Sequence, residues 1–197
     1  MTNERVIEVP WVLMQLPQFG IILDVGSCDA TYLCAIQHSD RILHCLDPRD
    51  CSSDIPPGAV FYQQSIIGND LPRAYYDAVL MLSVLEHIGL PCYGQAPFPN
   101  GDQLALAEAW SLLKPSCPVI VTVPVGQSKV VTWHRQYSPT TLHQLFKGWR
   151  TEISYWGFDS TRYLPISESE VERHDYRDYP FVGAGSGALA GIIAYRS

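Results

Sequence analysis

The chain has 197 residues, a length that suits one α/β domain, and its 47% hydrophobic content can build a core without disulfides, which excludes a disordered chain. Its 13 Lys and Arg stand against 20 Asp and Glu, and the formal charge of -7 argues against nucleic acid and against an anionic membrane surface as partners. No apolar run approaches the roughly 18 residues of a spanning helix, and residues 1–9 lack a signal region, so we expect a cytoplasmic protein.

Short apolar runs separated by helical stretches organise the first 125 residues. Gly20–Val25 and Arg41–Asp47 are typical of buried parallel strands, and three more strands are predicted at 59–63, 77–82 and 118–124. This alternation predicts a Rossmann-like, doubly wound α/β fold. Helices are predicted over residues 30–38, 102–113 and 139–147.

The pattern changes after residue 150. Residues 150–158 and 189–195 are strand-like and should lie antiparallel to each other, which predicts a seven-strand sheet, mostly parallel, with one antiparallel strand near the C-terminus. No linker divides the chain, so 1–197 is predicted to be a single domain. The irregular segments 89–101 and 163–187 follow strand ends, where open α/β sheets bind ligands, and are predicted to form substrate-side loops.

Cysteine spacing gives no sign of a metal site or a disulfide framework. The chain contains no CxxC pair, and a protein of this size does not depend on disulfides for a stable core. We therefore expect reduced thiols and no bound metal. The six cysteines are Cys28, Cys34, Cys45, Cys51, Cys92 and Cys117.

The first predicted strand ends in Asp24 and enters a turn at Gly26. A glycine there lets a ligand approach the backbone closely, and the amides that open the next helix can meet a carboxylate. The frame that starts at Gly26 carries Cys28 and Thr31 where a dinucleotide fingerprint has glycines, which disfavours NAD. No phosphate loop of an NTPase occurs in the chain.

Asp47 ends the second predicted strand. A carboxylate at this place accepts hydrogen bonds from both ribose hydroxyls of a nucleoside. The alternative is a turn-forming residue in the Asp47-Pro48 pair.

Four pieces of sequence stand in a fixed order: Leu23–Gly26, Asp47, the run Tyr76–Leu80 into Val84–Ile88, and Leu113–Pro115 before the strand to Pro124. Together they resemble the motif set of the class I S-adenosylmethionine-dependent methyltransferases over about residues 20–150. A narrower set is similar to a little-characterised methyltransferase-like group known as a domain of unknown function. It comprises Glu86–Gly89, Tyr93–Gly94, Asn100–Asp102, Val123–Gly126, His134, Arg135 and Tyr137.

The resemblance implies S-adenosylmethionine as the cofactor. It implies that Asp24, aided by Asp29, favours the methionine ammonium and that Asp47 holds the ribose. Ser65 stands near the place where many members set an Asp against the adenine amine, and the residues after the fourth strand would flank the sulfonium. The predicted cofactor-binding residues are Asp24, Gly26, Ser27, Asp29, Asp47, Ser65, Leu82 and Ser83.

Two histidines are candidates for a catalytic base. His87 follows the fourth strand, where a methyl group would be presented, and imidazole titrates near physiological pH; the alternative is that His87 only packs under the cofactor. His134 follows the fifth strand in a segment expected to fold over the pocket; the alternative is an exposed loop. A divalent ion held by His87, Asp102 and His134 is disfavoured because their spacing is long.

Polar and aromatic residues near these histidines are candidates for acceptor binding. Arg135 could clamp a carboxylate or phosphate, and aromatic side chains stack on sugar rings or planar systems. The predicted substrate-binding residues are Tyr93, Arg135 and Tyr137, with Trp133 and Tyr163 as further lining.

The resemblance implies a methyltransferase. We expect a small polar, glycosidic or natural-product acceptor that is methylated on oxygen, with nitrogen and carbon as the less favoured alternatives. No region of the chain is large enough to form a helical cap for a protein or RNA substrate. The alternative function is a protein that binds S-adenosylmethionine without catalysis, as a regulator or scaffold. A homodimer is left open.

Overall fold

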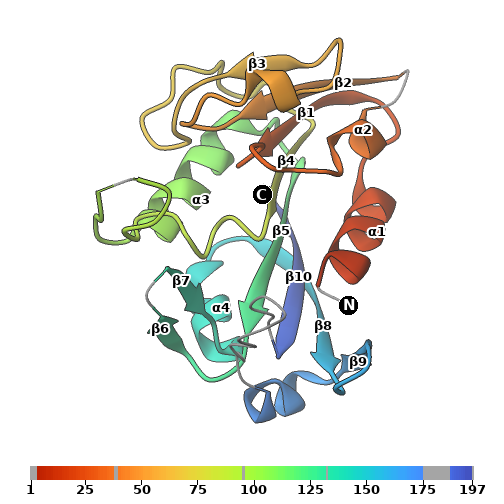
Figure 1. Ribbon diagram of the computed structural model, residues 1–197, viewed down its shortest axis with the longest axis vertical. Helices are drawn as coiled ribbons and strands as arrows, with labels where there is room; N and C mark the ends of the chain where they lie inside the picture. Colours follow the sequence, from red (N-terminus) through yellow and green to blue (C-terminus); the bar gives the residue numbers. More distant parts are fainter. Residues whose placement is uncertain (1–3, 38–39, 95, 132, 175–186, 197) are drawn as a thin grey trace.

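An eight-stranded sheet runs through the computed structural model, which describes residues 4–37, 40–94, 96–131, 133–174 and 187–196 (Figure 1). The strand order is β3-β2-β1-β4-β5-β10-β8-β9, and the first five strands are parallel. These five lie within two residues of their predicted bounds. They are β1 (Gly20–Val25), β2 (Arg41–Leu46), β3 (Val60–Tyr62), β4 (Ala78–Leu82) and β5 (Pro118–Val125).

The prediction of seven strands with one reversed is wrong by one strand. As predicted, β10 (Ala188–Tyr195) pairs antiparallel with β8 (Arg150–Phe158), and it also pairs antiparallel with β5. The additional strand β9 (Tyr163–Ile166) lies antiparallel on β8, inside the segment predicted as a loop. The Asp159 side chain causes this return, because its Oδ1 accepts hydrogen bonds from the amides of the next turn, at Thr161 and Arg162.

The rest of the predicted loop 163–187 is only partly described. Residues 168–173 form a 3-10 helix, η2 (Glu168–Arg173), and residues 175–186 lie outside the described part of the chain. Two short elements were not predicted. They are the 3-10 helix η1 (Ser52–Asp54) and the hairpin of β6 (Lys129–Val131) and β7 (His134–Gln136).

Helices cover both faces of the sheet, with α1 and α2 on one side and α3 and α4 on the other (Figure 1). The helices predicted over 102–113 and 139–147 are confirmed, whereas the one predicted over 30–38 is reduced to a single turn, and α1 was not predicted. Within the described residues, no helix has the length and apolarity that crossing a membrane requires. The helices are α1 (Arg5–Gln15), α2 (Leu33–Ile36), α3 (Gly101–Leu112) and α4 (Pro139–Leu145).

Alternating strand residues build two apolar cores, one on each face of the sheet. In β1, for example, Leu23 and Val25 pack under α3, whereas Ile22 packs with α1 and α2. Trp11 of α1 lies against β10 and meets Trp156 edge to face at 5.7 Å. This indole therefore joins the first helix to the antiparallel half of the sheet.

Gly191 of β10 is the residue that makes room for this indole. A Cβ at position 191 would lie 2.7–2.8 Å from three ring atoms of Trp11. We expect Gly191→Ala to lower the free energy of unfolding by about 1–3 kcal/mol because the indole must shift. Denaturant unfolding measures this loss, and the same substitution in a Trp11→Leu background should cost clearly less; an equal cost in both backgrounds would contradict the packing.

The strand order places a crevice at the carboxyl ends of β1 and β4. From β1 the chain continues to β2 and β3 on one side, and it then returns to β4 on the other side. Open α/β sheets bind ligands at such a switch of direction. This edge of the sheet is therefore where a ligand site is expected.

Candidate cofactor and acceptor site

A cavity of about 180 Å³ lies at the carboxyl ends of the first four strands. Six of the predicted cofactor residues line it, together with His87 and Tyr93, which come from the segment after β4. Asp24 and Ser27 do not line it. The six residues are Gly26, Asp29, Asp47, Ser65, Leu82 and Ser83.

Asp24 and Ser27 were predicted to bind the cofactor, but both side chains are buried beneath the turn that follows β1. Both are fully buried; Ser27 Oγ donates to Asp24 Oδ2 at 2.7 Å, and the Tyr32 hydroxyl donates to Asp24 Oδ1 at 3.3 Å. Burial raises the pKa of Asp24 to about 7. The pair thus orders the turn. Gly26 in the same turn has φ +79, and a Cβ added at this position would lie 2.5 Å from Val84 Cγ2, so there is no room for a side chain.

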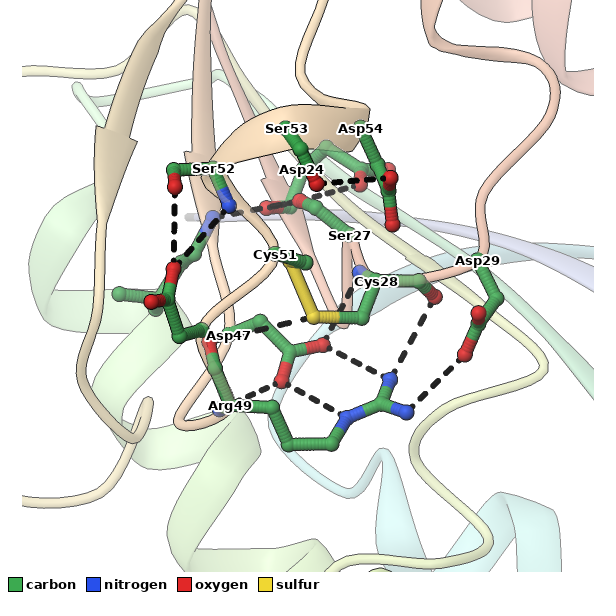
Figure 2. Close-up of a disulfide and its surroundings, with 12 residues drawn as sticks. Asp24, Ser27, Cys28, Asp29, Asp47, Arg49, Cys51, Ser52, Ser53 and Asp54 are labelled. Atoms are coloured by element: carbon green, nitrogen blue, oxygen red, sulfur yellow. Dashed lines mark hydrogen bonds and ion pairs between the residues drawn. A yellow bond between two sulfur atoms is a disulfide. The ribbon is translucent and has the colours of Figure 1, made fainter.

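The Asp47 carboxylate lies at the end of β2 and is held by four hydrogen bonds (Figure 2). Its Oδ2 accepts from the Cys28 amide at 3.0 Å and from Arg49 Nη2 at 3.2 Å. Its Oδ1 accepts from the Arg49 amide at 2.9 Å and from Arg49 Nε at 3.2 Å. A carboxylate has about four acceptor positions, so a ribose diol can bind Asp47 only if the guanidinium moves away.

Arg49 spans the mouth of this cavity. Its Nη1 lies 3.0 Å from Asp29 Oδ2 (Figure 2). Its guanidinium carbon lies 5.0 Å from the centroid of the Tyr93 ring. Arg49 was not among the predicted site residues. The available signal was a basic residue two positions after the acidic end of a strand.

A disulfide joins Cys28 in the turn after β1 to Cys51 after β2, which makes the prediction of six reduced thiols wrong (Figure 2). The parallel pairing of β1 and β2 brings the two following loops together, and the two Cα atoms are 5.5 Å apart. Among the described residues, Cys28, Cys51 and Asp47 are also spaced closely enough to hold a metal. The two sulfurs bonded to each other are not thiolate ligands, however.

The disulfide should stabilise the fold as well as the turn. We expect the double variant Cys28→Ala, Cys51→Ala to lose about 2–4 kcal/mol of unfolding free energy, because the bond no longer restricts the unfolded chain. Urea unfolding of the oxidised protein and of the variant measures the difference. The matched control is Cys34→Ala, at an exposed free cysteine. An equal stability of variant and control would show that the bond contributes nothing.

A second cavity of about 230 Å³ adjoins the first. Four residues line both cavities, so the two meet at the end of β4. The shared residues are Arg5, Ser83, His87 and Tyr93. The second cavity is completed by Glu4, Glu86, Pro124, Trp133, His134 and Leu189.

Glu8 fixes α1 above this junction. It is fully buried and accepts hydrogen bonds from Ser83 Oγ at 2.5 Å, from Thr122 Oγ1 at 2.7 Å and from Arg5 Nη1 at 3.1 Å. Ser83 also has a left-handed backbone, with φ 49, which is uncommon for a residue other than glycine. The first helix is therefore tied to the ends of β4 and β5 by a charged group that sequence reasoning overlooked.

His87 lies at the junction in a defined tautomer. Its Nδ1 is 2.7 Å from the Trp133 carbonyl oxygen, which can only accept, so Nδ1 carries the hydrogen. Its Nε2 is then unprotonated in the neutral ring and lies 3.8 Å from Glu86 Oε1. The ring stacks on the Trp133 indole at 5.1 Å, and burial lowers the pKa of His87 below its ordinary value.

The residues predicted around His134 line two different hollows. His134 is buried and lines the second cavity, with its ring centroid 6.3 Å from that of His87. Arg135 and Tyr137 line a separate hollow with Asp102. Arg135 Nη1 donates to the Ile88 carbonyl at 2.8 Å, and the Tyr137 hydroxyl donates to Asp102 Oδ2 at 3.1 Å.

The structure therefore gathers only part of the predicted acceptor set. His87, His134, Tyr93 and Trp133 share the second cavity. Arg135 and Tyr137 are not brought to it, and Asp102 is engaged with them, away from the two histidines. Tyr163, at the start of β9, lies outside the lining but contributes a hydrogen bond to the Glu4 carboxylate.

Solved structures of S-adenosylmethionine-dependent methyltransferases share this fold. An N1-methyltransferase for 1,6-didemethyltoxoflavin from Burkholderia thailandensis, with that compound and S-adenosylhomocysteine bound, has a TM-score of 0.65 at 12% identity, over 96% of this chain and 77% of its own. A possible histamine N-methyltransferase from Thermotoga maritima has a TM-score of 0.63 at 17% identity, over 98% and 89%. An N-methyltransferase from Bradyrhizobium japonicum, in complex with S-adenosylhomocysteine, has 0.64 at 10% identity, over 98% and 87%.

The chain has the class I S-adenosylmethionine-dependent methyltransferase fold. Neither a protein-family model nor a curated protein matches its sequence. The resemblance seen in the motifs is thus confirmed at the level of the fold.

Proposed function

We propose that this protein binds S-adenosylmethionine in the first cavity and transfers its methyl group to a small acceptor in the second. The observation that carries the proposal is the junction of the two cavities at Ser83 and His87, on the carboxyl edge of the parallel strands. A donor and an acceptor bound on either side of this junction would meet there.

The residues of the first cavity fit the parts of such a cofactor. Gly26 leaves the backbone bare for close approach, and Asp47 offers its carboxylate to the ribose diol once Arg49 has moved. Arg5 brings a positive charge to the same cavity and is suited to the methionine carboxylate. When bound, the cofactor supplies an electrophilic methyl group. Leu82 and Ser83 place the end of β4 against that group.

Catalysis in this arrangement rests mainly on holding two reactants at near-attack distance. The second cavity suits a small acceptor, and the unprotonated Nε2 of His87 is available to accept its proton. The sequence favoured oxygen as the methylated atom.

We expect both S-adenosylmethionine and S-adenosylhomocysteine to bind with micromolar affinity and to raise the melting temperature. Ligand at 100 times its dissociation constant adds about 2.7 kcal/mol of stability. NAD is the control and should cause no shift, because Cys28 replaces a glycine of the dinucleotide fingerprint. A protein that neither sulfur nucleoside stabilises would refute the assignment.

A regulator or scaffold that only binds the cofactor would pass this binding test and fail to release methylated product. Mass spectrometry of acceptor mixtures with a labelled methyl donor distinguishes the two functions. A cytoplasmic location and a homodimer stay predictions. The disulfide is relevant to the predicted location, because stable disulfides are rare in reducing compartments such as the cytoplasm.

A further inference from the structure

Two glutamates that line the second cavity each have a carboxylate oxygen without a hydrogen-bond partner among the described residues. Glu86 is 3% exposed, and within the described residues its buried Oε2 has no hydrogen-bond partner. Oε2 of Glu4, which also lines the cavity, is likewise buried and has no hydrogen-bond partner among the described residues. Burial raises the pKa of both carboxyls. An unsatisfied buried acceptor is costly unless a ligand completes it.

The cations around this cavity do not balance its carboxylates. Arg5 is the cation that lines it among the described residues, and its Nη1 is already paired with Glu8 at 3.1 Å. Arg135 directs its guanidinium to the Ile88 carbonyl and toward Asp102, outside the cavity. A positively charged ligand would therefore supply what the cavity lacks.

Aromatic rings form the remaining wall. His87 stacks on Trp133 at 5.1 Å with the planes 11° apart, and Tyr93 meets His87 edge to face at 5.4 Å. His134 packs against Trp133 at 4.6 Å. Rings of this kind attract ammonium groups through the negative charge of their faces, and they also stack on planar ligands.

We propose that the acceptor is a small arylalkylamine, with its amine on an alkyl side chain of an aromatic ring, whose ammonium group binds between Glu86 and Glu4, and that its nitrogen is the atom methylated. This inference rests on the proposed function, because it assigns the substrate class of the same site. An alcohol would bring no positive charge, and Arg5, which is already paired with Glu8, would stay the only Arg or Lys that lines the cavity within the described residues.

The reaction balances with groups that the site contains. The bound ammonium first gives one proton to His87 Nε2, and the resulting imidazolium lies between the Trp133 carbonyl and the Glu86 carboxylate. The nitrogen lone pair then forms a bond to the methyl carbon, and the bond from that carbon to sulfur breaks with its electron pair left on sulfur. The product is an N-methylammonium ion, and His87 returns its proton to water.

A matched pair of ligands tests the inference without any substitution. The protein is saturated with S-adenosylhomocysteine, and 2-phenylethylamine and 2-phenylethanol are titrated by calorimetry. These ligands differ only in the ammonium and hydroxyl groups. We expect the amine to bind at least about 10-fold more tightly than the alcohol, since hydrogen bonds to charged groups are worth more than neutral ones. Incubation of the amine with the methyl donor should also yield its N-methyl derivative, detected by mass.

Two substitutions then locate the binding group. Glu86→Gln and Glu4→Gln should each weaken the amine about 10-fold or more and leave the alcohol nearly unchanged. The control is Glu152→Gln, an exposed carboxylate on β8 that should change neither. The use of both glutamates keeps the test decisive if one variant does not fold.

Each outcome has a distinct meaning. Binding of S-adenosylhomocysteine without any preference for the amine overturns this inference and leaves the proposed function intact. No binding of either sulfur nucleoside overturns both. If the two variants weaken S-adenosylmethionine but not S-adenosylhomocysteine, the carboxylates serve the sulfonium charge of the cofactor, and the inference is wrong.

Discussion

Replacing His87 with Ala is expected to lower turnover roughly 100-fold to 10,000-fold while cofactor affinity stays nearly intact. The reason is that Nε2 of the neutral ring is the proposed proton acceptor at the junction of the two cavities, with the tautomer set by the Trp133 carbonyl. Single-turnover assays at saturating cofactor measure the loss once an acceptor is known.

The pH profile provides a second readout for His87. Only the neutral ring accepts a proton, and burial lowers the pKa of His87. Activity should therefore persist below pH 6.5, the ordinary histidine value, and fall only as the pH drops through the lowered pKa. An acidic limb at or above 6.5 would contradict the assignment.

His134 and His143 serve as comparisons. His134→Ala should chiefly raise the Michaelis constant of the acceptor, because this ring lines the second cavity without reaching the first. His143→Ala, on the exposed side of α4, should change neither constant. Full activity of both His87→Ala and His134→Ala would remove general-base catalysis by histidine and leave positioning alone.

Asp47→Ala is expected to weaken S-adenosylhomocysteine binding by about 1.5–3 kcal/mol, because hydrogen bonds from the ribose to a charged acceptor are lost. The control is Asp54→Ala, in η1, whose carboxylate contacts only the neighbouring Ser53 in the described structure. Isothermal titration measures both affinities. An unchanged affinity in a folded Asp47→Ala protein would make Asp47 a turn residue only.

A substitution at Arg49 also distinguishes a ribose-binding role of Asp47 from a role in the turn alone. Its guanidinium donates twice to the carboxylate that the ribose needs. We expect Arg49→Met to tighten S-adenosylhomocysteine binding severalfold, because the ligand no longer has to displace these bonds. A weaker affinity in Arg49→Met would mean that the guanidinium holds Asp47 in its binding position and stays there when ligand is bound.

The sequence by itself determined the parallel half of this protein and pointed to the sheet edge where the candidate site lies. Apolar runs such as 20–25 and 118–124 have no polar face to expose, so they can only be central strands, and their ends then meet at one edge. For this reason the sequence pointed to Asp47 and to the segment after β4, which line the first cavity, and also to Asp24, which does not. Such signals are local, because each of them lies within one short stretch of the chain.

Only the tertiary structure decided which side chains meet. Cys28 and Cys51 are 23 residues apart, and their disulfide depends on the register of two strands. Glu8, which anchors α1, is satisfied by donors on two distant strands. Likewise, the role proposed for Glu86 depends on its buried Oε2, which has no hydrogen-bond partner among the described residues. These properties arise from contacts between distant parts of the chain, and periodicity along a sequence carries no information about them.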